Sequence, residues 1–377
     1  MQGPRGPFSS LAGLPVRGDA DLSSGECFIE IVPERATVPG LPPLLTSPEY
    51  TPPWIVGLHQ ATMPTAPIGA YLLRDALFGG RAYTLWRGGF PDSPALLPEY
   101  WRRMIREGTA EGVPDGSLAR REVAGPSVHF VGRDYNSHGH WWLDIAPRLF
   151  FLYRRFPELR KRLTLLVPRD LSEAHRRILA RIYDLPADRF ERYDPDTEVL
   201  LSPIALVPTM VHRDYWFHPS AAEFYRHVVD AVAGAPRARP GAGHERLYVS
   251  RARFTEGRRV SRVMVNAAEV ESLMREQGFC VVHPEELAIE EQIATFSRAR
   301  VVVGEHGSAM KNTLFCPEGT VVVNLHWLNR TQSAIAACRG HRTIFLQSSP
   351  VDSGEDGTAR YRIDVGKLKE CVRVALG

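Results

Sequence analysis

The sequence contains little lysine and carries a small net charge, and both features limit what can be inferred about binding partners from its charged residues. Four of its 46 basic residues are lysines, and the formal net charge is +3 over 377 residues. A charge this small gives no indication of a nucleic-acid partner. The strong preference for arginine, alongside much Ala, Gly and Pro, is typical of a coding bias, so a single surface arginine is weak evidence for binding.

Cysteines and long apolar runs are also scarce. The five cysteines are widely spaced and form no Cys-x-x-Cys pair (Cys27, Cys280, Cys316, Cys338 and Cys371). That pattern argues against a disulfide framework and against a zinc site built from cysteines. The N-terminus lacks the apolar core of a signal peptide, and no apolar run approaches the ~18 residues of a membrane-spanning helix. We therefore expect a cytoplasmic protein without a membrane span, and peripheral membrane contact is left open.

Length and composition indicate a soluble protein of two domains. Hydrophobic residues make up 44% and charged residues 24% of the chain, which is ordinary for a globular protein. The chain is longer than one typical domain. Ten of the 30 prolines fall in residues 1–60, which opposes long helices there. The predicted divisions are an irregular Pro-rich segment at 1–60, an acceptor-side α/β domain at 61–232, a linker at 233–246, a Rossmann-like domain at 247–350, and a tail or helix at 351–377.

The second half of the chain alternates between apolar strands and helix-like segments. The strands are LYVS, FCVVH, RVVVG, TVVVNL and RTIFLQ, an order typical of a parallel sheet covered on both faces. The first half is less regular. It predicts strands at CFIEIV, LTLLVP and IALVP, an amphipathic helix at SEAHRRILARIY, and a helix from His140 to Phe156 with Pro147 in its first turn. The predicted fold class is α/β with two Rossmann-like domains, of which the C-terminal one is the more regular.

A buried strand runs directly into Gly-Glu-His-Gly in the stretch RVVVGEHGSAMKNTLF. Ligands of open parallel sheets bind beyond the carboxyl ends of the strands. Gly304 and Gly307 allow unusual backbone angles and close approaches. Ser308 can cap the next helix, and His306 can donate a hydrogen bond to an anion there. We predict a phosphate-binding turn, and the alternative is a tight turn with a capping serine and a satisfied histidine.

A second strand points to the same place. The stretch LYVSRARFTEGRR puts Ser250, Arg251 and Arg253 at the carboxyl end of the first strand after the linker. The planar fork of arginine matches phosphate oxygens. Arg251 is the stronger candidate because it directly follows the strand, and solvated surface arginines are the alternative.

The stretch YNSHGHWWLD, in the first half, concentrates groups suited to acid–base chemistry. It contains His138, His140 and Asp144 with Trp141 and Trp142 between them. A general base needs an imidazole or carboxylate beside the reacting hydroxyl, and a tryptophan at a cleft offers a flat face to a sugar. The alternative is that Asp144 caps a helix and the tryptophans are core residues, which we favour for Trp142.

Together these segments resemble glycosyltransferase family 61, which includes bacterial capsular-polysaccharide-type transferases and eukaryotic protein and xylan glycosyltransferases. The resemblance is carried by GHWWLDIAPRL, LYVSR, EEQIATFSRA, VVGEHGSAMKNTLF and CPEGTVVV, in that order, over roughly residues 130–330. Their order and spacing are more specific than any single motif.

The resemblance implies two GT-B-like domains facing a cleft, with inverting, metal-independent transfer in polysaccharide or glycoconjugate biosynthesis. No cofactor is implied beyond a nucleotide-sugar co-substrate, with a UDP-sugar as first candidate, and the acceptor would be a glycan or glycoconjugate. By position, the donor or phosphate site would comprise Arg251, Arg253, His306, Gly307, Ser308 and Asn312. The acceptor side or cleft would include His138, Trp141, Glu305 and Lys311.

The implied chemistry requires a base and a set of cations. Asp144 is the candidate base, with His140 as the alternative or as its orienting partner. Arg251, His306 and helix N–H groups would offset the charge that grows on the leaving diphosphate. Ser308, Lys311 and Glu305 depart from the family pattern, and a carboxylate at position 305 is unfavourable beside a diphosphate unless it points away or binds the ribose.

Two other classes of function are weighed against this one. A zinc-dependent hydrolase would use His138, His140 and Asp144 as part of a ligand set. A non-catalytic nucleotide-sugar-binding protein would keep the C-terminal domain and need no base. A dinucleotide-dependent oxidoreductase is less favoured, because LYVSRARFTEG lacks the G-x-G-x-x-G turn.

Overall fold

The computed structural model divides the chain into two compact units. Unit 1 comprises Met1–Ala36 and Pro64–Ala221, and unit 2 comprises Thr37–Met63 and Ala222–Gly377. The structure describes residues 16–18, 28–46, 53–86, 90–112, 118–130, 132, 134–232, 245–256, 260–354 and 357–377. The predicted linker at 233–246 lies outside the described residues as far as residue 244.

Unit 1 is built on a mixed sheet. Its strands are β1 (Val16–Gly18), β2 (Phe28–Val32), β4 (Ile68–Gly79), β5 (Tyr83–Leu85), β6 (Phe90–Asp92), β7 (Ala119–Glu122), β8 (Ser127–Val128), β9 (Thr164–Pro168), β10 (Phe190–Tyr193), β11 (Glu198–Pro208), β12 (His212–Arg213) and β13 (Trp216–Phe217). The main sheet has the order β10-β9-β8-β11-β4-β2, with β5 paired to β4 and β7 to β11. The long β11 and β4 are antiparallel, whereas β8, β9 and β10 pair in parallel. The strands predicted at CFIEIV, LTLLVP and IALVP are therefore confirmed as β2, β9 and the end of β11.

The helices of unit 1 include one with unusual winding. They are α3 (Glu99–Arg106), α4 (His138–His140), the π-helix η2 (Trp141–Ile145), α5 (Arg148–Arg155), the 3₁₀-helices η3 (Pro157–Lys161) and η4 (Ala187–Arg189), and α6 (Glu173–Tyr183). The helix predicted from His140 to Phe156 is confirmed only in part. Its first half is π-wound, with the Ala146 N–H bonded to the Trp141 carbonyl, and Pro147 caps α5. Such π-turns within helices are frequent at functional sites.

Unit 2 is built on the parallel sheet that the alternating pattern predicts. Its strands are β3 (Leu45–Thr46), β14 (Arg246–Val249), β15 (Arg262–Met264), β16 (Cys280–Val282), β17 (Val301–Glu305), β18 (Val321–His326), β19 (Arg342–Gln347), β20 (Ser349–Ser353) and β21 (Ala359–Arg362). The main sheet has the order β16-β14-β17-β18-β19-β3, and all its pairs are parallel. Its apolar core is lined by side chains of these strands and of the helices beside them, among them Val303, Val323, Met274 and Leu368.

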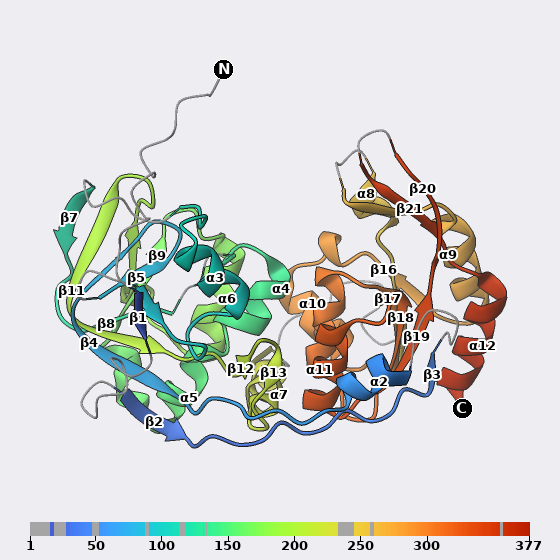
Figure 1. Ribbon diagram of the computed structural model, residues 1–377, viewed down its shortest axis with the longest axis horizontal. Helices are drawn as coiled ribbons and strands as arrows, with labels where there is room; N and C mark the ends of the chain where they lie inside the picture. The colour runs from blue at the N-terminus through green and yellow to red at the C-terminus, as the bar shows by residue number, and fades with distance from the viewer. Residues whose placement is uncertain are drawn as a thin grey trace. The chain divides into compact units, whose positions relative to one another are not determined.

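The helices of unit 2 are α2 (Pro53–His59), α7 (Ala221–Val232), α8 (Ala252–Thr255), α9 (Ala267–Glu276), η5 (Pro284–Glu286), α10 (Ile289–Phe296), η6 (Ser308–Phe315), α11 (Arg330–Arg339) and α12 (Val365–Leu376). Two of these helices, α2 and α12, lie in segments that the sequence prediction separates from the Rossmann-like domain. Residues 37–63 supply β3, which pairs with β19, and α2, which lies against α11 (Figure 1). Residues after 350 supply β21, which pairs with β15, and α12, whose N-cap is Asp364.

The segment after β17 differs from its prediction. The helix η6 is a 3₁₀-helix rather than an α-helix, and its N-cap is Gly307 instead of Ser308, so the predicted serine cap is wrong. Neither Gly304 nor Gly307 has a positive φ in the left-handed region. Gly304 lies in a tight space, because a Cβ there would lie 2.6 Å from Met310 Sδ and 3.0 Å from Val249 Cβ, so these side chains would have to shift.

No helix within the described part of the chain is long and apolar enough to cross a membrane.

Candidate active site

Three neighbouring strands of unit 2 end at one edge of the parallel sheet. Val249 of β14 is in register with Gly304 of β17, which is in register with Asn324 of β18. The residues that follow these strands therefore gather at this edge, where open parallel sheets bind ligands. They include Arg251 after β14 and His306 after β17.

Two guanidinium groups converge beside Gly307. A Cβ at this position would lie 3.4 Å from Arg262 Nη2 and 3.8 Å from Arg251 Nη1. Arg251 Nη1 and Arg262 Nε are buried and have no hydrogen-bond partner among the described residues. Burial, with the charge of Arg251 as the second cause, lowers the pKa of Arg262. Two cations held this close repel each other, so the arrangement favours an anion between them.

Glu305 supplies a negative charge next to these cations. Its side chain is buried, it accepts a hydrogen bond from the Tyr361 hydroxyl, and its Oε2 lies 3.9 Å from Arg251 Nη1. Burial, and then the Glu305 charge, raise the pKa of Tyr361, which keeps the phenol protonated. The Glu305 carboxylate thus accepts a hydrogen bond from the neutral Tyr361 hydroxyl and offsets part of the charge of Arg251. These two contacts explain how an acidic residue can lie near an anion site.

His306 lies within the same cluster. Its main-chain oxygen accepts a hydrogen bond from Arg262, and Asn329 Nδ2 lies 3.0 Å from its Nε2. Burial, followed by the charges of Lys311 and Arg262, lowers the pKa of His306 to about 3. The imidazole is therefore neutral near pH 7 and can offer a hydrogen bond but no charge.

Several residues assigned to the donor site from the sequence make other contacts. Asn312 is fully buried and donates a hydrogen bond to Gln292 Oε1, 2.8 Å away, so it joins η6 to α10. Arg253 is exposed and pairs with Glu286 at 2.7 Å. Ser308 is exposed at the start of η6 and Lys311 is buried. Of the predicted donor residues, the structure brings together Arg251, His306 and Gly307.

Unit 1 contains a second polar cluster, centred on Asp144. His140 Nδ1 donates a hydrogen bond to Asp144 Oδ2 at 2.6 Å, and His212 Nε2 donates one to Asp144 Oδ1 at 2.7 Å. The Tyr215 N–H donates to His212 Nδ1 at 3.2 Å, which fixes the tautomer of His212. Arg148 donates to the Asp144 carbonyl and holds the π-turn in place.

The electrostatics of Asp144 follow from these contacts. Burial by itself raises its pKa, but the hydrogen bonds from His140 and His212 outweigh burial and hold the pKa well below the usual range. The carboxylate stays ionised with both oxygens engaged. The Asp144 side chain is 10% exposed, that of His212 is 0% exposed and that of His140 is 34% exposed. His140 is thus the member of the cluster with solvent access.

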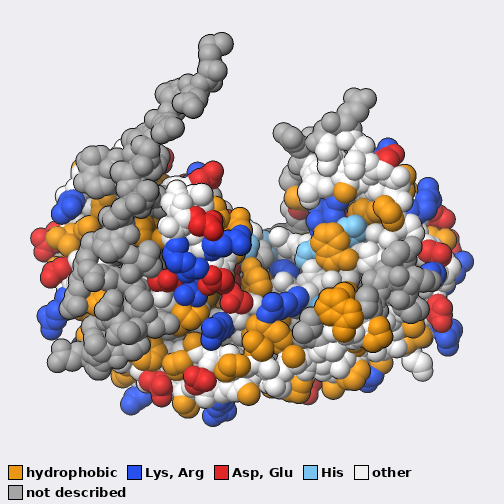
Figure 2. All heavy atoms as spheres, in the orientation of Figure 1, with side chains coloured by type: hydrophobic (Ala, Val, Ile, Leu, Met, Phe, Trp, Pro, Cys, Tyr) orange, Lys and Arg blue, Asp and Glu red, His pale blue; other side chains and the backbone are white. Residues whose placement is uncertain are grey.

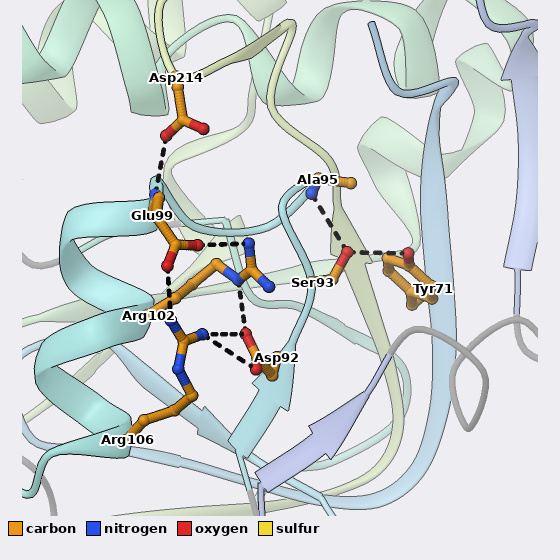
Figure 3. A network of polar contacts seen from close by, with 8 residues as sticks. All are labelled: Tyr71, Asp92, Ser93, Ala95, Glu99, Arg102, Arg106 and Asp214. Carbon is orange, nitrogen blue, oxygen red and sulfur yellow. Dashed lines mark hydrogen bonds and ion pairs between the residues drawn. The ribbon is translucent and has the colours of Figure 1, made fainter. Parts of the chain in front are cut away.

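A strained hairpin presents His212 to Asp144. The turn between β12 and β13 consists of Asp214 (φ 48°) and Tyr215 (φ 66°), both left-handed, as a two-residue hairpin turn of the mirror-image type requires. Asp214 Oδ1 accepts a hydrogen bond from the Glu99 N–H at 2.8 Å, which ties the turn to the start of α3 (Figure 3).

The same helix is anchored to the neighbouring strand by ion pairs. Arg102 and Arg106 both contact Asp92 of β6 and Glu99, as Figure 3 shows. The hairpin that carries His212 is therefore attached to a helix that is itself fixed to β6, a strand of the two-stranded sheet β1-β6.

The remaining acceptor-side residues lie elsewhere. Trp141 was expected at a cleft, but it is fully buried and its ring stacks on His175 at 4.3 Å, so no ring face is left for a sugar. Trp142 is a core residue, as favoured from the sequence. The ring of His138 lies 6.5 Å from that of Trp142, and the second imidazole on Asp144 is that of His212 instead.

The alternative interpretation as a zinc site gains no support from this geometry. Among the described residues, no group of three or more His, Cys, Asp or Glu is arranged to hold a metal ion.

Sequence reasoning missed several members of both clusters. His212 and Tyr361 are separated from their partners by 68 and 56 residues and lie in short strands without a motif. The ring of Trp327 lies 5.4 Å from that of His306. Trp327 directly follows β18 and could have been found by the strand-end rule that identified Arg251.

The comparisons with known proteins concern the segment that holds most of these residues. Residues 138–323 match a family model described as Glycosyltransferase 61. The matched range contains Asp144, His212, Arg251 and His306, and ends before Trp327. No curated protein matches the chain.

Proposed function

The chain belongs to glycosyltransferase family 61, and on that premise we propose that it is an inverting, metal-independent enzyme that uses a nucleoside diphosphate sugar as donor. The acceptor is the hydroxyl group of a glycan or glycoconjugate. One observation carries the proposal: Arg251 and Arg262 converge beside Gly307 with buried N–H groups that have no hydrogen-bond partner among the described residues. Such a pair is suited to the two phosphates of a leaving diphosphate.

On the donor side, the reaction breaks the bond between the anomeric carbon and the diphosphate oxygen. The electron pair stays on the diphosphate, so negative charge increases there as the bond lengthens. Arg251 and Arg262 are already in place to offset that charge, and no reorganisation is needed at the moment of reaction. Because His306 is neutral, it adds a hydrogen bond and leaves the charge to the two arginines.

On the acceptor side, the geometry favours His140 as the base and Asp144 as its positioning residue. Both Asp144 oxygens already accept hydrogen bonds and its pKa is held low, which makes it a weak proton acceptor. His140 donates Nδ1–H to Asp144, so Nε2 of the neutral ring carries the basic lone pair. The acceptor oxygen attacks the anomeric carbon, and its proton passes to His140.

The proposal also includes inversion at the anomeric carbon and a GT-B-like arrangement of the two units. A single displacement needs one base and one charge-stabilising cluster, and unit 1 and unit 2 each contain one. The anomeric configuration of the product, read by proton NMR at early times, tests inversion. A product that retains the donor configuration would contradict the single displacement.

The proposal is tested first by donor binding in EDTA. Nucleoside diphosphates, with UDP as first candidate, should raise the Tm of the full chain, since a ligand at ~100 times its Kd adds about 2.7 kcal/mol of stability. Arg251→Ala should remove most of that shift. The matched control is Arg275→Ala, an exposed arginine of α9 that pairs with Glu271 at 2.8 Å, and it should keep the shift. A wild-type protein that binds no nucleotide in EDTA but does so with a divalent cation would overturn metal independence.

A further inference from the structure

Three aromatic rings form a stack at the edge of the unit 2 sheet. The ring of Tyr361 lies 4.0 Å from that of His326 at an interplanar angle of 25°, and the His326 ring lies 4.3 Å from that of Trp327 at 32°. Tyr361 is fully buried, whereas Trp327 is 40% exposed. The stack therefore begins in the core and ends in a large aromatic ring at the surface.

The backbone that turns Trp327 outward is strained. His326 has a φ of 97°, a conformation that residues with a Cβ rarely adopt. It is held there by Ser348, whose N–H donates to the His326 carbonyl at 3.0 Å and whose Oγ lies 2.7 Å from His326 Nδ1. Strain of this kind persists where the surroundings fix it, and it often accompanies a functional constraint.

Trp327 adjoins the cationic cluster described above. The Arg262 Cζ lies 5.8 Å from the centroid of the Trp327 ring, and the His306 ring lies 5.4 Å from it. On unit 2, Figure 2 shows histidine and basic side chains gathered together with hydrophobic ones. An anion held by Arg262 would thus have a partly exposed tryptophan side chain next to it.

We propose that Trp327 is the platform on which the planar base of a nucleotide stacks while the phosphates of that nucleotide lie on Arg251 and Arg262. The inference rests on the proposed function and adds a specificity-determining residue to it. Base–aromatic stacking tolerates every base, because each one has a π face. Trp327 thus distinguishes nucleotides from phosphates without a base, and other contacts would choose among the bases.

The exposure of Trp327 fits this role better than a structural one. A core tryptophan gains stability from full burial, and Trp327 instead keeps 40% of its surface exposed beside the guanidinium group of Arg262. The stack behind it is neutral on its inner side, since burial lowers the pKa of His326 to about 4. The Trp327 ring therefore packs against an uncharged imidazole, and the positive charge of the cluster stays available to bind the phosphates.

The test compares two ligands that differ in the base. Isothermal titration calorimetry measures UDP and inorganic pyrophosphate binding to the full chain and to Trp327→Ala and Trp327→Phe. Trp327→Ala should weaken UDP binding roughly ten- to hundredfold and leave pyrophosphate binding unchanged. Trp327→Phe should retain most of the UDP affinity. The matched control is Trp54→Ala, which removes another exposed tryptophan of unit 2, on α2, and should change neither affinity.

Each other outcome overturns a defined part of the argument. Equal losses of UDP and pyrophosphate would show that Trp327 supports the cation cluster rather than a base. Unchanged UDP binding in Trp327→Ala would remove the platform and leave the proposed function standing. If only a UDP-sugar and not UDP loses affinity, the ring stacks on the sugar and the inference is wrong. A wild-type protein that binds neither ligand would contradict the proposed function itself.

Discussion

His140 Nδ1 lies 2.6 Å from Asp144 Oδ2 in a segment that winds through one π-turn, and the second carboxylate oxygen is bonded to His212. One carboxylate thus orients two imidazoles. Only the His140 imidazole has appreciable solvent access. The pair resembles a base and its orienting partner more closely than a carboxylate base with a passive neighbour.

Asp144→Asn and His140→Asn separate these roles. If His140 is the base, both changes should lower kcat by ~10²–10⁴, because an amide in place of the Asp144 carboxylate can no longer fix the tautomer of the ring. The double variant should be little worse than either single one, since the two residues act as a unit. Transfer rates and donor affinity are measured side by side, and donor affinity should be unchanged.

A His140→Asn variant that keeps most of its activity while Asp144→Asn loses it would assign the base to Asp144. The pH dependence of kcat gives a second readout. If His140 is the proton acceptor, the rise of kcat with pH should be lost in His140→Asn. A variant that only disturbs packing should keep that rise.

Glu305 should limit the anion affinity of the donor cluster. Glu305→Gln removes a negative charge 3.9 Å from Arg251 Nη1 and keeps an oxygen that can accept the Tyr361 hydrogen bond. The affinity for pyrophosphate should rise about three- to tenfold, in proportion to the repulsion removed. Calorimetry at low and moderate salt measures the change. Glu286→Gln, an exposed acid paired with Arg253, is the control. A weaker affinity in Glu305→Gln would mean that the carboxylate mainly positions Arg251.

The sequence allowed the second half of the fold to be predicted because its strands are short, apolar and regularly separated by helices. The strand-end rule then placed Arg251 and His306 together, and β14 and β17 are indeed neighbours in the sheet. The rule needs no long-range information, since parallel strands connected by helices place their carboxyl ends at one edge.

The parts that escaped prediction depend on contacts between distant segments. Nothing near His212 in the sequence indicates that its ring will bond a carboxylate 68 residues earlier. Residues 37–63 join unit 2 through two residues of β3 and one short helix, which is too little pattern to recognise. The π-turn at Trp141–Ile145 depends on tertiary packing that local propensity does not encode.

The hairpin turn at Asp214 should be a positioning element for His212. Asp214→Ala removes the acceptor of the Glu99 N–H and replaces a residue that tolerates the left-handed conformation with one that rarely adopts it. The free energy of unfolding should fall by about 1–2 kcal/mol, and kcat should fall as His212 loosens. Asp214→Asn keeps both the acceptor oxygen and the tolerance for positive φ, so it should be nearly silent. Chemical denaturation measures the stability of the two variants, and transfer assays measure their kcat. Equal effects of the two substitutions would contradict the role of the turn in positioning His212.

Stability should depend on pH through a buried histidine of unit 1. His129 is fully buried, its ring lies 4.3 Å from that of Phe78, and burial lowers its pKa from 6.5 to about 3. The unfolded chain binds a proton at His129 below pH 6.5, but the folded chain does so only near pH 3. The contribution of neutral His129 to the free energy of unfolding is therefore complete above pH 6.5. It is lost as the pH falls from 6.5 toward 3, by about 1.4 kcal/mol per pH unit.

His129→Leu removes this titration while keeping an apolar side chain in the same space. Urea unfolding at about pH 7, 6 and 5 should show a shallower loss of stability in the variant, by about 1.4 kcal/mol per unit below roughly pH 6.5. Other histidines with a lowered pKa, such as His175 and His341, contribute to the slope of both proteins and cancel in the difference. Parallel slopes for the two proteins would mean that folded His129 gains a proton as readily as unfolded His129, and thus that water reaches its ring.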